Sequence, residues 1–230
     1  MKFQTIFLLL LFSLSLSAQD DPMEGRYTFV FLNTNEARAE LPQAEADSLQ
    51  AGHRANINRL VKDRKMIAAG PFMGGGGIFL FDTNLQETQA VLDSDPAIAA
   101  GRFTLEVIPF NMDMGKICTL WDLPKESIEM TTYFIVRYTN KFESDGAYAA
   151  KTNRFTLDHL KKAKREIKDV EILGDLNFDG NQGQVVIFKG TESEMDSYEA
   201  YFGAHKLVKQ VIMDFYLRQI YFAKGVFCEK

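Results

Sequence analysis

The chain has 230 residues, of which 46% are apolar and 25% are charged, and its formal charge at pH 7 is −5. This composition is ordinary for a globular protein with a core of its own. The acidic balance and the lack of a basic cluster argue against nucleic acid as a partner, because surfaces that bind nucleic acid are rich in lysine and arginine.

The first residues have the pattern of a secretory signal peptide. Lys2 is followed by an apolar run over residues 6–16 and by small residues ending at Ala18. The run is too short to span a bilayer as a helix. We expect cleavage after Ala18, so that residues 1–18 are the signal and no membrane segment remains. Loss of Lys2 then takes the formal charge from −5 to −6. The expected location is the periplasm or the extracellular space.

The next part of the chain predicts strands and helices in the order β-α-β-β-α-β. Strands are expected at residues 26–32, 66–69, 78–82 and 102–110, and helices at 42–65 and 84–93. Asn84 with Glu87 three residues later is a capping arrangement. Gly70-Pro71 is expected to stop the second strand, since proline cannot donate to a ladder. The glycines at 74–77 precede a strand and are expected to form a hairpin connection beside the site entrance.

The same pattern begins again after a connector at residues 113–130, with a period near 105 residues between Tyr27 and Thr132. Strands are expected at 132–138, 170–173, 184–188 and 211–222, and helices at 151–168 and 192–202. This is the order of ferredoxin-like folds. A sheet with helices on one face leaves its other face to be buried. The predicted fold class is therefore α+β, with two tandem ferredoxin-like repeats packed sheet to sheet as an intrachain pseudo-dimer.

His53 is the first candidate functional residue. It lies on the apolar face of the first predicted helix, with Leu49, Ile57 and Leu60 at steps of three and four residues. A histidine in this place is either a general acid or base, or a core residue held by a backbone carbonyl. The residues alone leave both alternatives open.

Several segments in residues 26–112 resemble the YCII-related (YciI-like) domains of the dimeric α/β-barrel group. The matching segments are His53 within residues 52–60, Ala69-Gly70-Pro71-Phe72, Gly77-Ile78-Phe79-Leu80, Asp95-Pro96, Ala100-Gly101-Arg102-Phe103 and Ile108-Pro109-Phe110. The resemblance implies a site built on a His–Asp pair, carried here by His53 and Asp95. Some relatives are associated with lyase chemistry on small molecules, including removal of chloride from a chlorinated aromatic diol. An aspartate before proline is otherwise a turn-former.

Residues 131–225 look like a degenerate copy of this domain. The counterpart of His53 is either His159 or Thr156, depending on whether the histidines or the apolar positions are aligned. Gly174-Asp175 stands where Gly70-Pro71 does, and no Asp-Pro occurs in this half. A second His–Asp site is therefore not expected.

The two cysteines, Cys118 and Cys228, form one disulfide or remain two buried thiols, and the sequence leaves this open. Residues 175–180 match the opening of a calcium loop, but its twelfth position is Val186, so a tight turn is preferred. Three histidines without paired spacing predict no transition-metal site. We expect no cofactor. A small-molecule ligand is either converted or only bound, or the protein is a structural module without a ligand. Further homo-oligomerisation stays open.

Overall fold

A computed structural model describes residues 27–142 and 146–228, so the expected signal at 1–18 lies outside the described residues. The strands are β1 (Tyr27–Thr34), β2 (Met66–Pro71), β3 (Gly77–Phe81), β4 (Phe103–Met114), β5 (Met130–Asn140), β6 (Glu171–Phe178), β7 (Gln184–Lys189) and β8 (Met213–Ala223). The α-helices are α1 (Gln43–Lys62), α2 (Leu85–Leu92), α3 (Pro96–Ala99), α4 (Gly146–Glu166), α5 (Met195–Gly203) and α6 (Lys206–Lys209).

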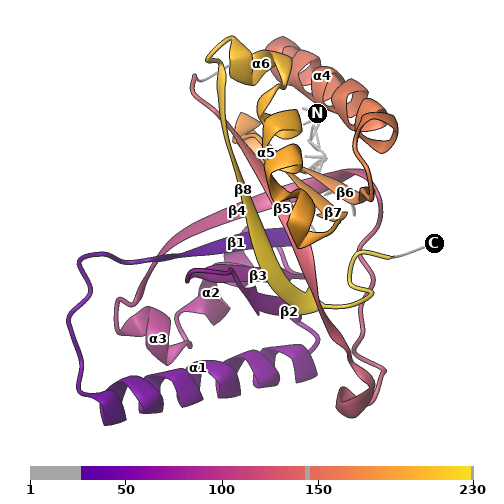
Figure 1. The fold of residues 1–230 in the computed structure, drawn as a ribbon. Coiled ribbons are helices and arrows are strands. Elements are labelled where there is room, and N and C mark those ends of the chain that lie inside the picture. The colour runs from indigo at the N-terminus through magenta and orange to yellow at the C-terminus, as the bar shows by residue number, and fades with distance from the viewer. Residues whose placement is uncertain (1–26, 143–145, 229–230) are drawn as a thin grey trace, which may run out of the picture.

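The strands form one eight-stranded sheet in the order β2-β3-β1-β4-β6-β7-β5-β8, and the paired strands are antiparallel. The protein is therefore an α+β fold. The two halves that we expected as facing sheets are joined edge to edge through β4 and β6, where Phe110 lies opposite Phe178. The outer strands also approach each other, because Phe72 forms an antiparallel bridge with Ile220. The sheet thus curves back toward itself (Figure 1).

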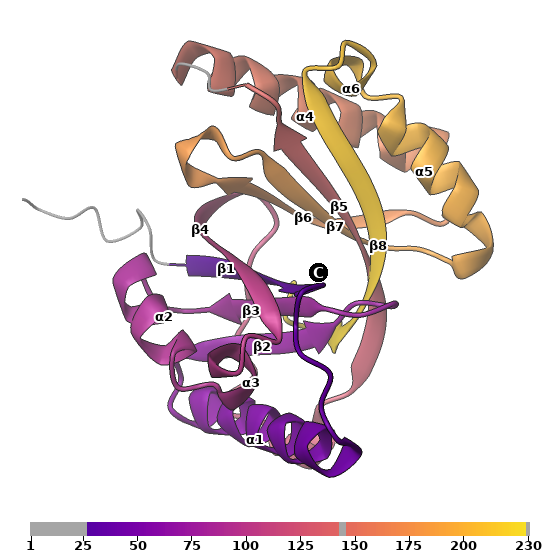
Figure 2. The same ribbon diagram turned by 90° about the vertical axis from the view of Figure 1, so that its left-hand side faces the viewer.

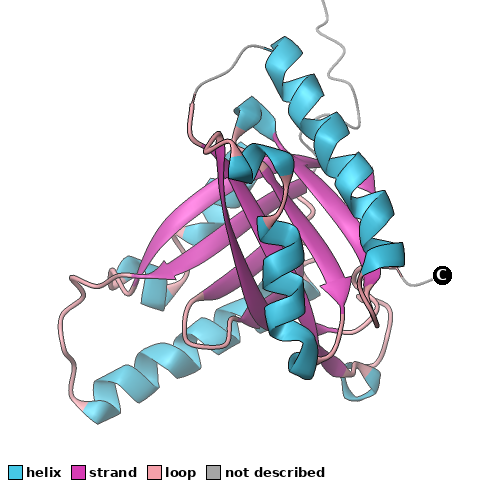
Figure 3. Ribbon diagram, turned by 45° about the horizontal axis from the view of Figure 1, so that its top comes forward, coloured by secondary structure: helices cyan, strands magenta, loops and turns pink. Residues whose placement is uncertain are grey.

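The helices lie outside the curved sheet, with α1–α3 beside the first four strands and α4–α6 beside the last four (Figures 2 and 3). A central apolar cluster contains residues of both halves, such as Phe29, Phe31, Tyr133 and Phe222. Two further clusters fill the spaces between the sheet and the helices of each half. The sheet face that the helices of one half leave bare is therefore buried against the other half. The sequence argument required such a covering for this face.

Several boundaries differ from the sequence prediction. The second strand was expected to end before Gly70-Pro71, but β2 includes both residues and ends at Pro71. Gly174 does not end β6, which continues to Phe178 through an irregularity in its pairing between Ile172 and Gly174. Residues 175–178 therefore belong to a strand, and only Asp179–Asn181 form a short 3₁₀ turn, which excludes a calcium loop beginning at residue 175. The short helices α3 and α6 were not predicted, since four residues carry no visible periodicity.

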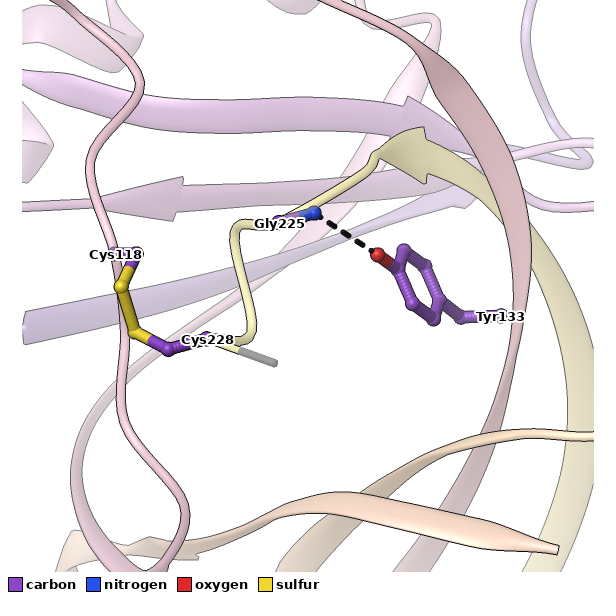
Figure 4. Close-up of a disulfide and its surroundings, with 4 residues drawn as sticks. All are labelled: Cys118, Tyr133, Gly225 and Cys228. Carbon is purple, nitrogen blue, oxygen red and sulfur yellow. Dashed lines mark hydrogen bonds between the residues drawn. A yellow bond between two sulfur atoms is a disulfide. The ribbon is translucent and has the colours of Figure 1, made fainter. Parts of the chain in front are cut away.

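The two cysteines form a disulfide whose Cα atoms are 5.4 Å apart (Figure 4). It joins the connector between the halves to the C-terminal segment. Phe227, the residue before Cys228, is fully buried in the central cluster, and the Gly225 N–H donates to the Tyr133 hydroxyl at 3.2 Å. The bridge therefore fixes both chain segments against the inner face of the sheet. None of the helices within the described ranges is long and apolar enough to cross a membrane.

Candidate functional site

His53 is placed by the middle of α1, at a point where this helix passes close to α3. Gly52 makes this approach possible, because a Cβ there would lie 2.7 Å from Cγ of Pro96. The His53 side chain is buried between α1 and the sheet, with the residue 8% exposed. The rings of Phe79 and Phe103 lie with their centroids 5.6 and 5.8 Å from the imidazole. Both aromatic rings restrict the orientation of the histidine.

Asp95 reaches the same point from the start of α3. It is the N-cap of that helix, and its Oδ1 accepts hydrogen bonds from the backbone N–H groups of Ala97 and Ile98 at 2.9 and 3.2 Å. Its Oδ2 lies 2.8 Å from His53 Nδ1 and 3.3 Å from Asn56 Nδ2. With 1% exposure, the carboxylate is held by four neighbours and faces the imidazole directly.

The charge state of Asp95 fixes the tautomer of His53. Burial opposes ionisation, but the hydrogen bond and charge of His53, with bonds from Ile98 and Asn56, outweigh it and hold the pKa of Asp95 below its usual value. An ionised carboxylate only accepts hydrogen bonds, so Nδ1 of His53 carries the proton and donates it. The neutral ring then has its lone pair on Nε2, to which no described residue donates a hydrogen bond.

His53 lines a pocket of about 440 Å³. The α1 face contributes Gln50, Arg54 and Ile57 beside the histidine, and the sheet contributes mainly apolar groups. The other lining residues are Leu32, Ala69, Gly70, Pro71, Gly76, Gly77, Ile78, Phe79 and Phe103. The size and the apolar lining with few polar groups are those of a site for a small organic molecule.

The connection between β2 and β3 forms one rim of this pocket. Gly74, Gly75 and Gly76 have φ angles of 93°, 105° and 73°, a region that side chains other than glycine rarely adopt. The expected hairpin is therefore present, and Gly76 and Gly77 place bare backbone at the pocket wall.

The second half has a different pair in the corresponding place. His205 is the N-cap of α6, as Asp95 is of α3, and its Nε2 lies 3.3 Å from Oγ1 of Thr156 on α4. Thr156, and not His159, therefore takes the place of His53. His159 instead stacks on Tyr201, with ring centroids 4.4 Å apart. No His–Asp pair forms between these residues.

Comparisons with known proteins agree on the fold. No family model matches the chain, and no curated protein matches it by sequence. Solved structures do match. A chlorite dismutase variant from Candidatus Nitrospira defluvii in complex with cyanide has a TM-score of 0.55 and 12% identity, over 86% of this chain and 91% of that chain. The same enzyme in complex with imidazole has a TM-score of 0.52 and 12% identity, over 88% and 92% of the two chains.

A heme-binding protein from Thermus thermophilus is also similar, with a TM-score of 0.48 and 13% identity over 86% of this chain and 91% of that chain. The comparisons place the chain among dimeric α/β-barrel-like folds, with an activity that they leave open.

The histidines of the second half are engaged in hydrogen bonds within that half. Nδ1 of His205 accepts from the Leu207 N–H and Nε2 faces Thr156, while His159 Nε2 donates to the Tyr201 carbonyl at 3.2 Å. Among the described residues, no group of three or more His, Cys, Asp or Glu side chains could hold a metal ion.

The sequence selected both members of the buried pair, and the structure brings them together. The sequence analysis missed Asn56, which donates a hydrogen bond to Asp95, and the pocket residues Gln50 and Arg54. A helical spacing of three or four residues puts Gln50, Asn56 and Ile57 beside His53, so this signal was available. The contribution of Phe103, fifty residues away on β4, had no comparable signal in the sequence.

Proposed function

We propose that the chain is an exported YCII-related protein in which His53 performs acid–base chemistry on a small organic molecule. The observation that carries this proposal is the 2.8 Å contact of His53 Nδ1 with an ionised, buried Asp95, beside a pocket of about 440 Å³. The two halves are proposed to be tandem ferredoxin-like repeats, which the repeated element order supports. The disulfide supports export, since such bonds persist in oxidising compartments.

In this proposal, Nε2 of neutral His53 accepts a proton from a C–H or O–H group of the ligand. The resulting imidazolium is stabilised by Asp95, and it returns the proton to the ligand or to a leaving group on the adjacent atom. An elimination of this lyase type breaks one C–H bond and one bond to the leaving group, and it forms a double bond. A positioned acid or base of this kind contributes roughly 10²- to 10⁴-fold to a rate.

The test is a screen of small carbonyl and hydroxy-aromatic compounds in D₂O, with deuterium incorporation and product formation followed by NMR. His53→Gln should abolish turnover. Asp95→Asn keeps an acceptor for the α3 cap but presents an amide N–H₂ to the histidine, which favours the tautomer with the proton on Nε2. This variant should therefore fold and lose most of the activity.

The alternative is a binding site without turnover, favoured by the apolar character of the pocket. In that case a ligand raises the melting temperature and His53→Gln changes its affinity, while no product or deuterium exchange is ever detected. A purely structural pair gives a third result, in which both substitutions lower the melting temperature and no compound raises it. Export is tested separately by the N-terminal sequence of the protein recovered from the periplasm or medium.

A further inference from the structure

A second, smaller pocket adjoins the His53 pocket. Its volume is about 220 Å³, and it shares the side chains of Gln50 and Phe103 with the larger pocket. Its remaining wall includes Arg38 and Arg102, which precede α1 and β4. The two pockets therefore lie side by side, an apolar one at His53 and an arginine-lined one, and together they are called the cleft.

The charged side chains around this cleft have one sign. Arg54 lines the larger pocket, Arg38 and Arg102 line the smaller one, and no Asp or Glu lines either. This contrasts with the rest of a chain that has 31 acidic and 26 basic residues. A cationic lining in an acidic protein favours an anionic ligand, because the cleft attracts a charge that the remaining surface repels.

The arginines of the cleft also lack ionic partners within the described residues. Other arginines nearby do have such partners. Arg59, on α1 with Arg54, pairs with Asp63 at 3.4 Å, and Arg64, just beyond the end of α1, pairs with Asp122. The guanidinium groups of Arg38 and Arg102 instead donate to the backbone carbonyls of Asn35 and Ala39. A guanidinium has five N–H donors, so each retains donors for a ligand while its backbone contact holds it in place.

We propose that the ligand is an elongated organic anion with one carboxylate. Its apolar, reacting part fills the His53 pocket, and Arg38 and Arg102 bind its carboxylate in the smaller pocket. This inference rests on the proposed function, since the His53 pocket must accept the ligand. Gln50 and Phe103 lie where the two parts of the ligand meet, and Arg54 adds positive charge at the larger pocket.

The experiment titrates the full chain with straight-chain monocarboxylates from butanoate to decanoate and with the matching primary alcohols. Amide NMR signals report each end separately, with Gly76 and Gly77 for the His53 pocket and Ala39 for the arginine pocket. Longer carboxylates should shift both sets of signals, and alcohols only the first set. Arg38→Gln and Arg102→Gln should each weaken carboxylate binding about tenfold and leave alcohol binding unchanged.

Arg165→Gln is the matched control, because it removes the same charge from an exposed site on α4 and should change no affinity. Arg102 also holds the Ala39 carbonyl, so Arg38→Gln, at a more exposed position, is the decisive variant if Arg102→Gln unfolds. The two-pocket inference alone is overturned if carboxylates bind at Gly76 and Gly77 as tightly in both arginine variants as in the wild type. It is also overturned if Arg54→Gln weakens carboxylate binding more than Arg38→Gln and Arg102→Gln do. If no compound in the series shifts the signals of Gly76 or Gly77, the inference fails. The proposed function is decided separately, by the screen in D₂O and by the variants His53→Gln and Asp95→Asn.

Discussion

Replacing Asp175 by asparagine should stabilise the protein above neutral pH and change little in acid solution. Asp175 lies in β6 and is fully buried. Its Oδ1 accepts from Gln184 Nε2 at 2.9 Å, while neither its Oδ2 nor Gln184 Oε1 has a hydrogen-bond partner within the described residues. Burial raises the pKa of Asp175 to about 7, although the bond from Gln184 favours the ionised form.

The magnitude follows from the difference between the folded and unfolded states. An unfolded aspartate titrates near 3.8 and the folded one at about 7. In that interval the folded protein holds a proton that the unfolded chain has released, so the free energy of unfolding falls as pH rises. A difference of roughly three units is about 4 kcal/mol at 1.36 kcal/mol per unit, fully lost above about pH 7. An asparagine has no such penalty.

The assay is urea unfolding of the wild type and Asp175→Asn between about pH 4 and pH 8, with the slope against urea checked for constancy. The free-energy difference between the two proteins should grow with pH and reach a few kcal/mol at the alkaline end. Asp93→Asn, at an exposed carboxylate, should change the curve by less than about 0.5 kcal/mol at every pH. A variant that is equally stabilised at both ends, or destabilised at alkaline pH, would refute the reasoning.

Burial lowers the pKa of His205 to about 4, so the free energy of unfolding should fall by roughly 3 kcal/mol as pH falls from about 6.5 to 4. His205→Asn keeps the cap acceptor and should remove this loss in the same urea assay. Cys118→Ser combined with Cys228→Ser opens a loop of 110 residues and should lower the unfolding free energy by about 2–5 kcal/mol in urea. Gly52→Ala should gain about 1 kcal/mol of helix propensity, but its Cβ should push Pro96 and α3 away from α1. The imidazole ¹⁵N signals of His53 would report this displacement as a weakened contact with the Asp95 carboxylate.

The regular elements could be predicted because hydrophobic periodicity and capping residues are local. Asn84 does cap α2 through the Glu87 N–H, as its spacing indicated. The end of β6 was misjudged because Gly174 has the local character of a strand break, while its pairing with β7 through Ile187 keeps the strand together. Pairing with a neighbouring strand is a tertiary effect, and no local pattern in the sequence reports it.

No local pattern in the sequence predicted the contact between His53 and Asp95, for a similar cause. The two residues are 42 positions apart, and they meet because a four-residue helix begins at Asp95. The dipeptide Asp95-Pro96 did contain the information, since aspartate is a favoured N-cap and proline a favoured first helical residue. From the residues alone a turn was the alternative for this dipeptide, because so short a helix shows no periodicity. Only the resemblance to a family linked the two residues in advance.

The second half explains why one chain should have a single site of the proposed acid–base type. There the helix contributes the hydroxyl of Thr156 and the cap contributes the imidazole of His205, so the imidazole lies on the cap and no carboxylate faces it from the helix. Nδ1 of His205 accepts the Leu207 N–H, and its Nε2 faces a hydroxyl. With a pKa of about 4, this ring is neutral at pH 7 and holds no nitrogen ready for a ligand. The His53 cleft should therefore bind one ligand per chain, and a stoichiometry of two would contradict this assignment.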